Sequence, residues 1–193
     1  MKILLIDNYD SFTYNVVHLL REVGVTDITV KRNTEIEIAK LINYDAVIAS
    51  PGPGLPAESG RLLEAVQFCL DNNKPYLGIC LGHQALGEAV GAKLQQLSAV
   101  KHGIQEPCIQ VGKSDLLAGL PRTFDIGRYH SWVVGKENLP AEFEVLATSQ
   151  DDVIQAAKVK DKIAYGLQFH PESIMSDVVG KTILRNFLNQ VNS

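Results

Sequence analysis

Cysteine is scarce in this chain of 193 residues, which contains only Cys69, Cys80 and Cys108. An odd count without a Cys-x-x-Cys pair argues against a disulfide framework and a cysteine-based zinc site, and it indicates a reducing cytoplasmic environment. No apolar run approaches the ~18 residues that a membrane helix needs, so no membrane partner is expected. The first residues also lack the layout of a signal peptide, because their apolar run is confined to Ile3–Ile6 and acidic residues follow at once.

Basic residues are in short supply too, with 18 Lys and Arg against 22 Asp and Glu and a formal net charge of −4. Since no basic run is present, nucleic acid is not expected as a partner. No metal-ligand or nucleotide motif is recognisable. The length favours one domain spanning 1–193, which would bury about 70% of its extended-chain surface.

Short apolar runs alternate with helical patterns in the first half of the chain. Ile3–Ile6 is a continuous apolar run, as expected of a parallel strand buried on both faces. The alternation indicates right-handed βαβ units and a mostly parallel sheet. We predict strands at Ile3–Ile6, Asp27–Lys31, Ala46–Ala49 and Pro75–Ile79, and helices over 16–23, Glu35–Leu41, Gly60–Leu70 and Gly82–Val90.

The pattern changes after Gly91. Residues 92–157 hold short apolar runs broken by Gly, Pro and Asn, which favour β-structure in an antiparallel extension. Ile163–Phe169 then returns as a strand, and Val178–Val191 has the pattern of a closing helix. The expected fold class is therefore α/β, with a mixed, mainly parallel central sheet flanked by helices and a small antiparallel β-rich extension.

A candidate nucleophile lies between a predicted strand and a predicted helix, in Gly78-Ile79-Cys80-Leu81-Gly82. This is the G-x-nucleophile-x-G elbow with cysteine in place of serine, in which the glycines permit a strained strand-to-helix turn. The helix N-terminus favours a thiolate over a thiol. The alternative is a buried cysteine packed under a βα turn. We expect Cys69 and Cys108 to be inert packing residues.

A candidate base follows the strand at Ile163–Phe169. His170 would lie at the carboxyl end of that strand, where open α/β sheets place their sites. Glu172 is close enough in sequence to accept a hydrogen bond from the imidazole, so Cys80, His170 and Glu172 have the logic of a nucleophile, a base and an orienting acid. A His-x-Glu segment is also common in purely structural settings.

The chain contains four other histidines, which we compare with His170 as candidates for the base. His83 follows Cys80 by three residues on the same predicted helix and has no adjacent acid, so we interpret it as a packing or supporting residue. His18 and His102 have no partner visible in the sequence. His130 precedes Ser131-Trp132 and could line the site, although a surface loop is the plainer interpretation.

The segment Pro51-Gly52-Pro53-Gly54 must form a loop after a strand. It lacks the GK[ST] ending of a phosphate-binding loop. Gly52 could instead offer its N–H to a developing oxyanion, together with the N–H of Leu81. The alternative is a rigid turn with no chemical role.

Taken together, these motifs resemble the class I glutamine amidotransferases of the Cys-His-Glu type. The matching segments are SPGPG (Ser50–Gly54), GICLGHQ (Gly78–Gln84) and GLQFHPES (Gly166–Ser173). The opening LLIDNYDSFTYN (Leu4–Asn15) is similar to the amidotransferase subunits that serve chorismate-aminating synthases. The resemblance covers essentially the whole chain.

The resemblance implies a glutaminase in which Cys80 attacks the side-chain amide of L-glutamine and His170 shuttles protons. Glu172 would orient His170. Ammonia would pass to a partner synthase subunit that uses chorismate and makes anthranilate or aminodeoxychorismate, with anthranilate favoured. No cofactor is implied for this chain, and any Mg²⁺ would belong to the partner. The implied substrate-binding residues are Gly52, Pro53, Gly54, Leu81, Gln84, Ser131 and Trp132, with tryptophan at 132 where leucine is frequent.

Two other functions remain as alternatives. A stand-alone cysteine hydrolase could use the same elbow, although the FHPES and GHQ segments speak against it. A non-catalytic interaction subunit could keep the fold, but it would most simply have lost Cys80, His170 or Glu172, and all three are present.

Overall fold

The computed structural model describes residues 1–98, 101–176 and 178–193 in full. Within this part of the chain, one nine-stranded sheet has the order β2-β1-β3-β4-β9-β8-β7-β5-β6. The strands from β2 to β9 in this order are parallel, and those from β8 to β6 are antiparallel. Their bounds are Lys2–Asp7 (β1), Asp27–Arg32 (β2), Ala46–Ala49 (β3), Tyr76–Ile79 (β4), Leu94–Gln110 (β5), Thr123–Val134 (β6), Phe143–Ser149 (β7), Ile154–Val159 (β8) and Ala164–Leu167 (β9).

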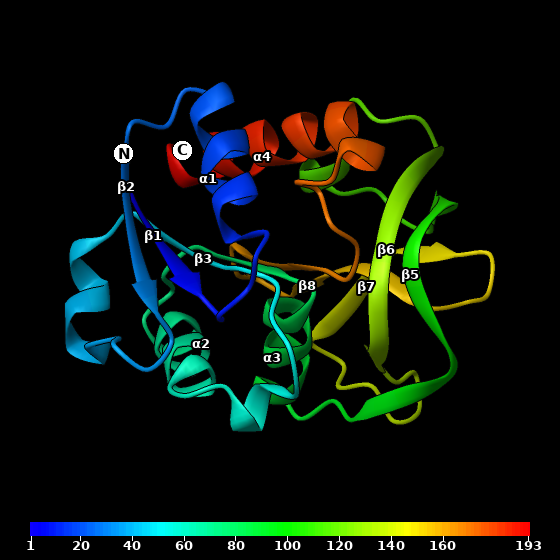
Figure 1. Cartoon of the computed structure of the whole chain (residues 1–193), viewed down its shortest axis with the longest axis horizontal. Helices are drawn as coiled ribbons and strands as arrows, with labels where there is room; N and C mark the ends of the chain where they lie inside the picture. The colour runs from blue at the N-terminus through cyan, green and yellow to red at the C-terminus, as the bar shows by residue number, and fades with distance from the viewer.

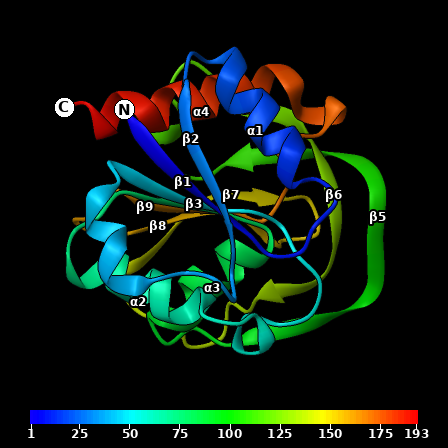
Figure 2. The same cartoon turned by 60° about the vertical axis from the view of Figure 1, so that its left-hand side comes forward.

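Helices cover both faces of the parallel half of the sheet (Figures 1 and 2). Helices α1 and α4 lie side by side on one face, and α2 and α3 lie together on the other. Each pair closes its own apolar layer against the sheet, so β1, β3 and β4 are buried on both sides. This two-sided burial explains their continuous apolar runs. The helices span Thr13–Glu22 (α1), Leu62–Asp71 (α2), Leu81–Ala89 (α3) and Asp177–Val191 (α4).

These elements confirm the predicted fold class and the mainly parallel first half. One predicted element is wrong in type. The segment expected to be an α-helix at Glu35–Leu41 forms a 3₁₀-helix at Ile38–Asn43, with hydrogen bonds from the Lys40 N–H to the Glu37 carbonyl and from the Tyr44 N–H to the Leu41 carbonyl. The segment is short and rich in β-branched isoleucine, which disfavours a regular α-helix.

The antiparallel half forms a curved wall beside the parallel strands. Strands β5 and β6 pair as a long ribbon at one end of the molecule (Figure 1). Further 3₁₀ turns are η2 (Pro56–Glu58), η3 (Asp115–Leu117) and η4 (Ile174–Ser176). No helix in the described residues is long and apolar enough to cross a membrane.

Parallel pairing determines where the candidate residues meet. The carboxyl ends of β3, β4 and β9 lie at the same edge of the sheet, because these strands are neighbours in parallel register. The segments that follow them begin at Ser50, Cys80 and Gln168. The fold therefore brings together three segments that are distant in sequence, at the edge where open α/β sheets place their sites.

Candidate active site

Cys80 occupies a strained elbow between β4 and α3. Its backbone has φ +50° and ψ −98°, a conformation that residues with a side chain rarely adopt. A Cβ on Gly78 would lie 2.2 Å from the carbonyl oxygen of Gly82, and a Cβ on Gly82 would lie 2.8 Å from the Cβ of Ala49. Both glycines of the elbow are therefore required by close packing. The Cys80 N–H donates to the Leu167 carbonyl at 2.7 Å, which joins the elbow to the end of β9.

His170 and Glu172 form a buried pair. The imidazole Nδ1 lies 2.6 Å from Glu172 Oε1, and the two side chains are 4% and 0% exposed. The rings of Tyr129 and Phe12 pack edge-on against the imidazole, with centroids 5.0 and 5.8 Å away. The contact with Glu172 and the two rings therefore fix the orientation of the imidazole.

The electrostatics of this pair favour a charged imidazole. Burial lowers the pKa of His170, but the neighbouring Cys80 and Glu172 side chains raise it, and the net result is a pKa well above the usual range. His170 Nε2 makes no hydrogen bond of ordinary geometry within the described residues. An imidazolium beside the sulfur is the setting that maintains a thiolate.

Cys80 opens into a cleft of about 430 Å³. The predicted residues Gly52, Pro53, Gly54, Gln84, Ser131 and Trp132 all line it. Leu81 lies just behind the lining, where its side chain packs against Gly52. The first residue of α3 is Leu81, and N–H groups in the first turn of a helix have no partner within the helix. The structure thus brings the predicted substrate residues to one cleft beside the predicted nucleophile.

Part of the cleft wall was not predicted from the sequence. Lys101 and His102 on β5 pair with His130 and Tyr129 on β6, and this register places the four side chains together. Leu55 and Glu58 also line the cleft. A strand pairing between residues 25 or more positions apart leaves no local signal in one sequence, so the place of Lys101, His102 and Tyr129 could not be found without the fold, whereas His130 was already named as a residue that could line the site.

The expectation that His130 lies in a surface loop is wrong. His130 lies within β6 and is 5% exposed. Its Nε2 accepts a hydrogen bond from Arg128 Nε at 3.2 Å. Burial, reinforced by the charge of Arg128, lowers the pKa of His130 to about 3, so the ring stays neutral.

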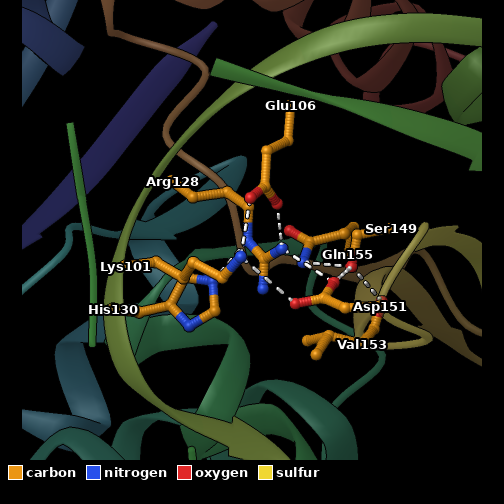
Figure 3. A network of polar contacts seen from close by, with 8 residues as sticks. All are labelled: Lys101, Glu106, Arg128, His130, Ser149, Asp151, Val153 and Gln155. Atoms are coloured by element: carbon orange, nitrogen blue, oxygen red, sulfur yellow. Dashed lines mark hydrogen bonds and ion pairs between the residues drawn. The ribbon is translucent and has the colours of Figure 1, made fainter. Parts of the chain in front are cut away.

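An ionic network around the buried Arg128 holds this wall in place (Figure 3). Arg128 is fully buried, and its Nη1 contacts both Glu106 and, at 2.8 Å, Asp151. Lys101 Nζ reaches the same two carboxylates at 2.6 and 3.5 Å. Burial raises the pKa of Asp151, but Arg128 and Ser149 lower it to about 2. Removing both carboxylates would leave the buried Arg128 guanidinium without these ionic partners, whereas removing the exposed Asp151 alone leaves Glu106 in contact with it.

Of the remaining histidines and cysteines, only His102 lines the cleft. His83 is fully buried, its pKa is lowered to about 3 by burial, and a Cβ on Gly166 would lie 2.3 Å from its Nδ1, which agrees with the packing role predicted for it. His18 is exposed beside Glu22. Cys69 and Cys108 are buried, and burial raises the pKa of each thiol to about 12. Both are therefore poor nucleophiles, as predicted.

Comparisons with known proteins agree with this geometry. The family model described as glutamine amidotransferase class-I matches residues 4–191. The chain is 40% identical to anthranilate synthase component 2 of Porphyra purpurea over 190 residues, which is 97% of this chain and 98% of that protein. It is also 40% identical over 190 residues to aminodeoxychorismate synthase component 2 of Klebsiella aerogenes, covering 97% of this chain and 100% of that protein.

A solved structure shows the same fold. A protein of Thermoplasma acidophilum, provisionally described as part of a GMP synthase, superposes with a TM-score of 0.88 at 28% identity, covering 100% of this chain and 94% of that one. Family match, identity and fold agree over nearly the full length, and the chain belongs to the class I glutamine amidotransferases.

Proposed function

We propose that this chain is a glutaminase subunit that hydrolyses L-glutamine and hands ammonia to a partner synthase. The observation that carries the proposal is the strained Cys80 elbow, opening into a cleft beside the buried His170–Glu172 pair. A positive φ at a non-glycine residue is costly, so its occurrence at the one cysteine that lines the cleft points to a chemical role. The other cysteines have regular backbone and buried, protonated thiols.

The proposed reaction gives each of these groups a role. The Cys80 thiolate attacks the side-chain amide carbon, and the carbonyl electrons move to an oxyanion that the N–H groups of Gly52 and Leu81 stabilise. The C–N bond then breaks, and the imidazolium of His170 donates a proton to the leaving ammonia. Water, deprotonated by His170, attacks the thioester and releases glutamate. The proton taken from water returns to the Cys80–His170 pair, and Glu172 orients the imidazole throughout.

Substrate binding is assigned to the wall formed by Gln84, Ser131 and Trp132, together with Pro53 and Gly54. The Gln84 amide nitrogen already donates to the Trp132 carbonyl at 2.8 Å. Its side-chain oxygen therefore remains free to face the substrate as an acceptor, which suits the α-ammonium group of glutamine. Because Trp132 contributes through its carbonyl, the replacement of the frequent leucine should have little effect.

Replacing Gly52 with alanine should lower kcat by about 10²–10³-fold, the cost of losing one oxyanion donor. A Cβ at Gly52 would lie 2.5 Å from the Asn8 Cβ and 2.7 Å from Leu81 Cδ2, so the loop must move and carry its N–H away from the cleft. Steady-state glutaminase kinetics measure the loss. Gly112→Ala is the matched control, because an added Cβ there meets no atom within 4 Å. Full turnover by folded Gly52→Ala would remove Gly52 from the oxyanion site.

The partner is assigned as a chorismate-using synthase, with anthranilate as the favoured product and aminodeoxychorismate as the alternative. Relatives of both kinds match this chain at 40% identity over nearly their full length, which supports the class of partner. Any Mg²⁺ requirement is assigned to the partner. The complex would work in the cytoplasm, where free cysteines such as Cys80 remain reduced.

The docking surface is assigned to the rim next to Glu172. A groove of about 330 Å³ is lined there by residues of α1 together with Glu172 and Ile174. Large apolar side chains are exposed on the same elements, with Tyr14 69% and Ile174 91% exposed. An exposed apolar side chain at the edge of a groove gives a partner an apolar contact there. A partner seated on this rim would contact the segment that carries the triad.

Docking of the synthase should raise glutamate release by at least about tenfold, because a misplacement of about 1 Å at the triad can cost around 10²-fold. The comparison is between the isolated chain and the chain with saturating synthase and chorismate. Assays with the synthase of each pathway, run with glutamine and with ammonium, identify the product.

Substitutions at the rim test whether the synthase activates glutamate release by docking there. Ile174→Asp should weaken the activation, whereas Val111→Asp should not, since Val111 is 55% exposed but lines neither the cleft nor the groove. Equal rates with and without the synthase would contradict the proposal and favour a stand-alone hydrolase.

A further inference from the structure

Gln168 lies directly behind the reacting sulfur. It follows the last residue of β9, is fully buried, and its side-chain Nε2 lies 3.6 Å from Cys80 Sγ. Its backbone N–H donates to the Gln155 carbonyl on β8 at 2.9 Å, which fixes the start of the side chain. The packing of the elbow and the contact between His170 and Glu172 do not by themselves require a side-chain amide at position 168.

The direction of the Gln168 amide is set by a second glutamine. Gln84 Nε2 donates to Gln168 Oε1 at 3.3 Å and to the Trp132 carbonyl at 2.8 Å. Since Gln168 Oε1 is occupied as an acceptor, the nitrogen end of the amide must face the sulfur. A rotated amide would place an oxygen against a thiolate and a donor against a donor.

We propose that Gln168 is a second, neutral hydrogen-bond donor to the Cys80 sulfur, held in that direction by Gln84. The proposal rests on the assignment of Cys80 as the nucleophile. In this role Gln168 stabilises the thiolate without transferring a proton. The two buried amides of Gln84 and Gln168 also connect the Trp132 carbonyl, on the substrate wall, to the sulfur.

A neutral donor has a distinct use in this reaction. His170 gives its proton to ammonia in the first half-reaction, so it cannot stabilise the sulfur in the same form throughout. The Gln168 N–H stays in place. When the second tetrahedral intermediate collapses, the carbon–sulfur bond breaks, its electron pair returns to sulfur, and the N–H again meets an anionic acceptor. Hydrogen bonds to charged groups are stronger than neutral ones, so the donor favours each state in which sulfur is a thiolate.

The test measures the rate at which iodoacetamide alkylates Cys80 as a function of pH, with the site of modification confirmed by peptide mapping. Gln168→Met keeps the length of the side chain and removes the donor. We expect alkylation of Cys80 at a given pH to slow about tenfold, because its thiolate loses a hydrogen-bond donor. Gln155→Met is the matched control, because Gln155 is equally buried on the adjacent strand and its side chain bonds Ser149. Its profile should superpose on that of the parent chain.

The outcomes separate this proposal from the proposed function. If Cys80 of the parent chain is alkylated no faster than Cys69 and Cys108, the assignment of the nucleophile fails. If Cys80 reacts selectively but Gln168→Met and Gln155→Met give the same profile, the role of Gln168 fails.

A measurement on the unaltered side chain covers the case in which Gln168→Met does not fold. The ¹H and ¹⁵N resonances of the Gln168 side-chain amide should shift as the thiol of Cys80 titrates, and they should stay constant over the same pH range in Cys80→Ala. A Gln168 amide signal that is independent of pH in the parent chain would overturn the proposal.

Discussion

Replacing Cys80 with alanine should abolish glutamine-dependent product formation by the assembled enzyme while leaving ammonium-dependent formation unchanged. The loss is expected to be complete, because no other cysteine reaches the cleft and the thiols of Cys69 and Cys108 are held protonated by burial. Ammonium bypasses this subunit and uses only the partner. Product assays with glutamine and with a high concentration of an ammonium salt measure the two routes.

Chemical labelling provides an independent check on Cys80. An electrophilic glutamine analogue should add one equivalent to the parent chain at Cys80, and Cys69→Ala should be labelled to the same extent. A Cys80→Ala complex that still uses glutamine, or a label found mainly at Cys69 or Cys108, would refute the assignment.

Removal of the His170 imidazole is expected to have the second largest effect. A general base contributes about 10²–10⁴-fold, and more where it also activates the nucleophile. His170→Ala should therefore lower kcat for glutamate release by at least that range. The His170 imidazole also keeps a positive charge beside Cys80, since the Cys80 and Glu172 side chains raise the pKa of His170. Steady-state kinetics of glutamate release, with the synthase present, measure the effect.

His83 and Glu172 provide the comparison. His83→Ala should lose clearly less activity than His170→Ala, because His83 is neutral and faces the backbone of Gly166. Glu172→Gln should give an intermediate loss. Because Glu172 contributes to the raised pKa of His170, its removal lowers that pKa, and the alkaline limb of the pH–rate profile should move to lower pH. A larger loss for His83→Ala than for His170→Ala would reverse the choice of base.

The parallel half of the fold was predictable from the sequence because its signals are local. Runs such as Ile3–Ile6 and Ala46–Ala49 are apolar throughout, and such runs suit only strands covered on both faces. The elbow was also predictable, since Gly78 and Gly82 flank Cys80 at the spacing that close packing requires. Parallel order then placed His170 beside Cys80.

The part of the cleft wall that β5 contributes was not predictable, because it depends on pairing between distant strands. Lys101 and His130 become neighbours only through the register of β5 with β6, and Arg128 is tolerated in the interior only because Glu106 and Asp151 reach it from other elements. One sequence carries no measure of those pairings. This is why His130 was assigned to a surface loop.

Gln168 shows a different limit. It lies within a recognisable motif, yet an amide carries no chemical signature of its own, unlike a cysteine or a histidine beside an acid. Its relation to Cys80 becomes visible only when Gln84 and Trp132, from two other elements, fix the direction of the amide.

The position of β9 has a consequence for synthesis of the chain. Strand β9 lies between β4 and β8, so the middle of the sheet is completed by the strand that is made after the other eight. A nascent chain that has not reached Ala164 carries Cys80 without His170 and exposes the backbone edge of β4, which is normally paired with β9. Under the proposed function such a chain would not consume glutamine, and its open edge is a template for wrong pairing with other chains. The proposed activity and protection of the β4 edge would therefore be acquired together, when β9 inserts into the centre of the sheet.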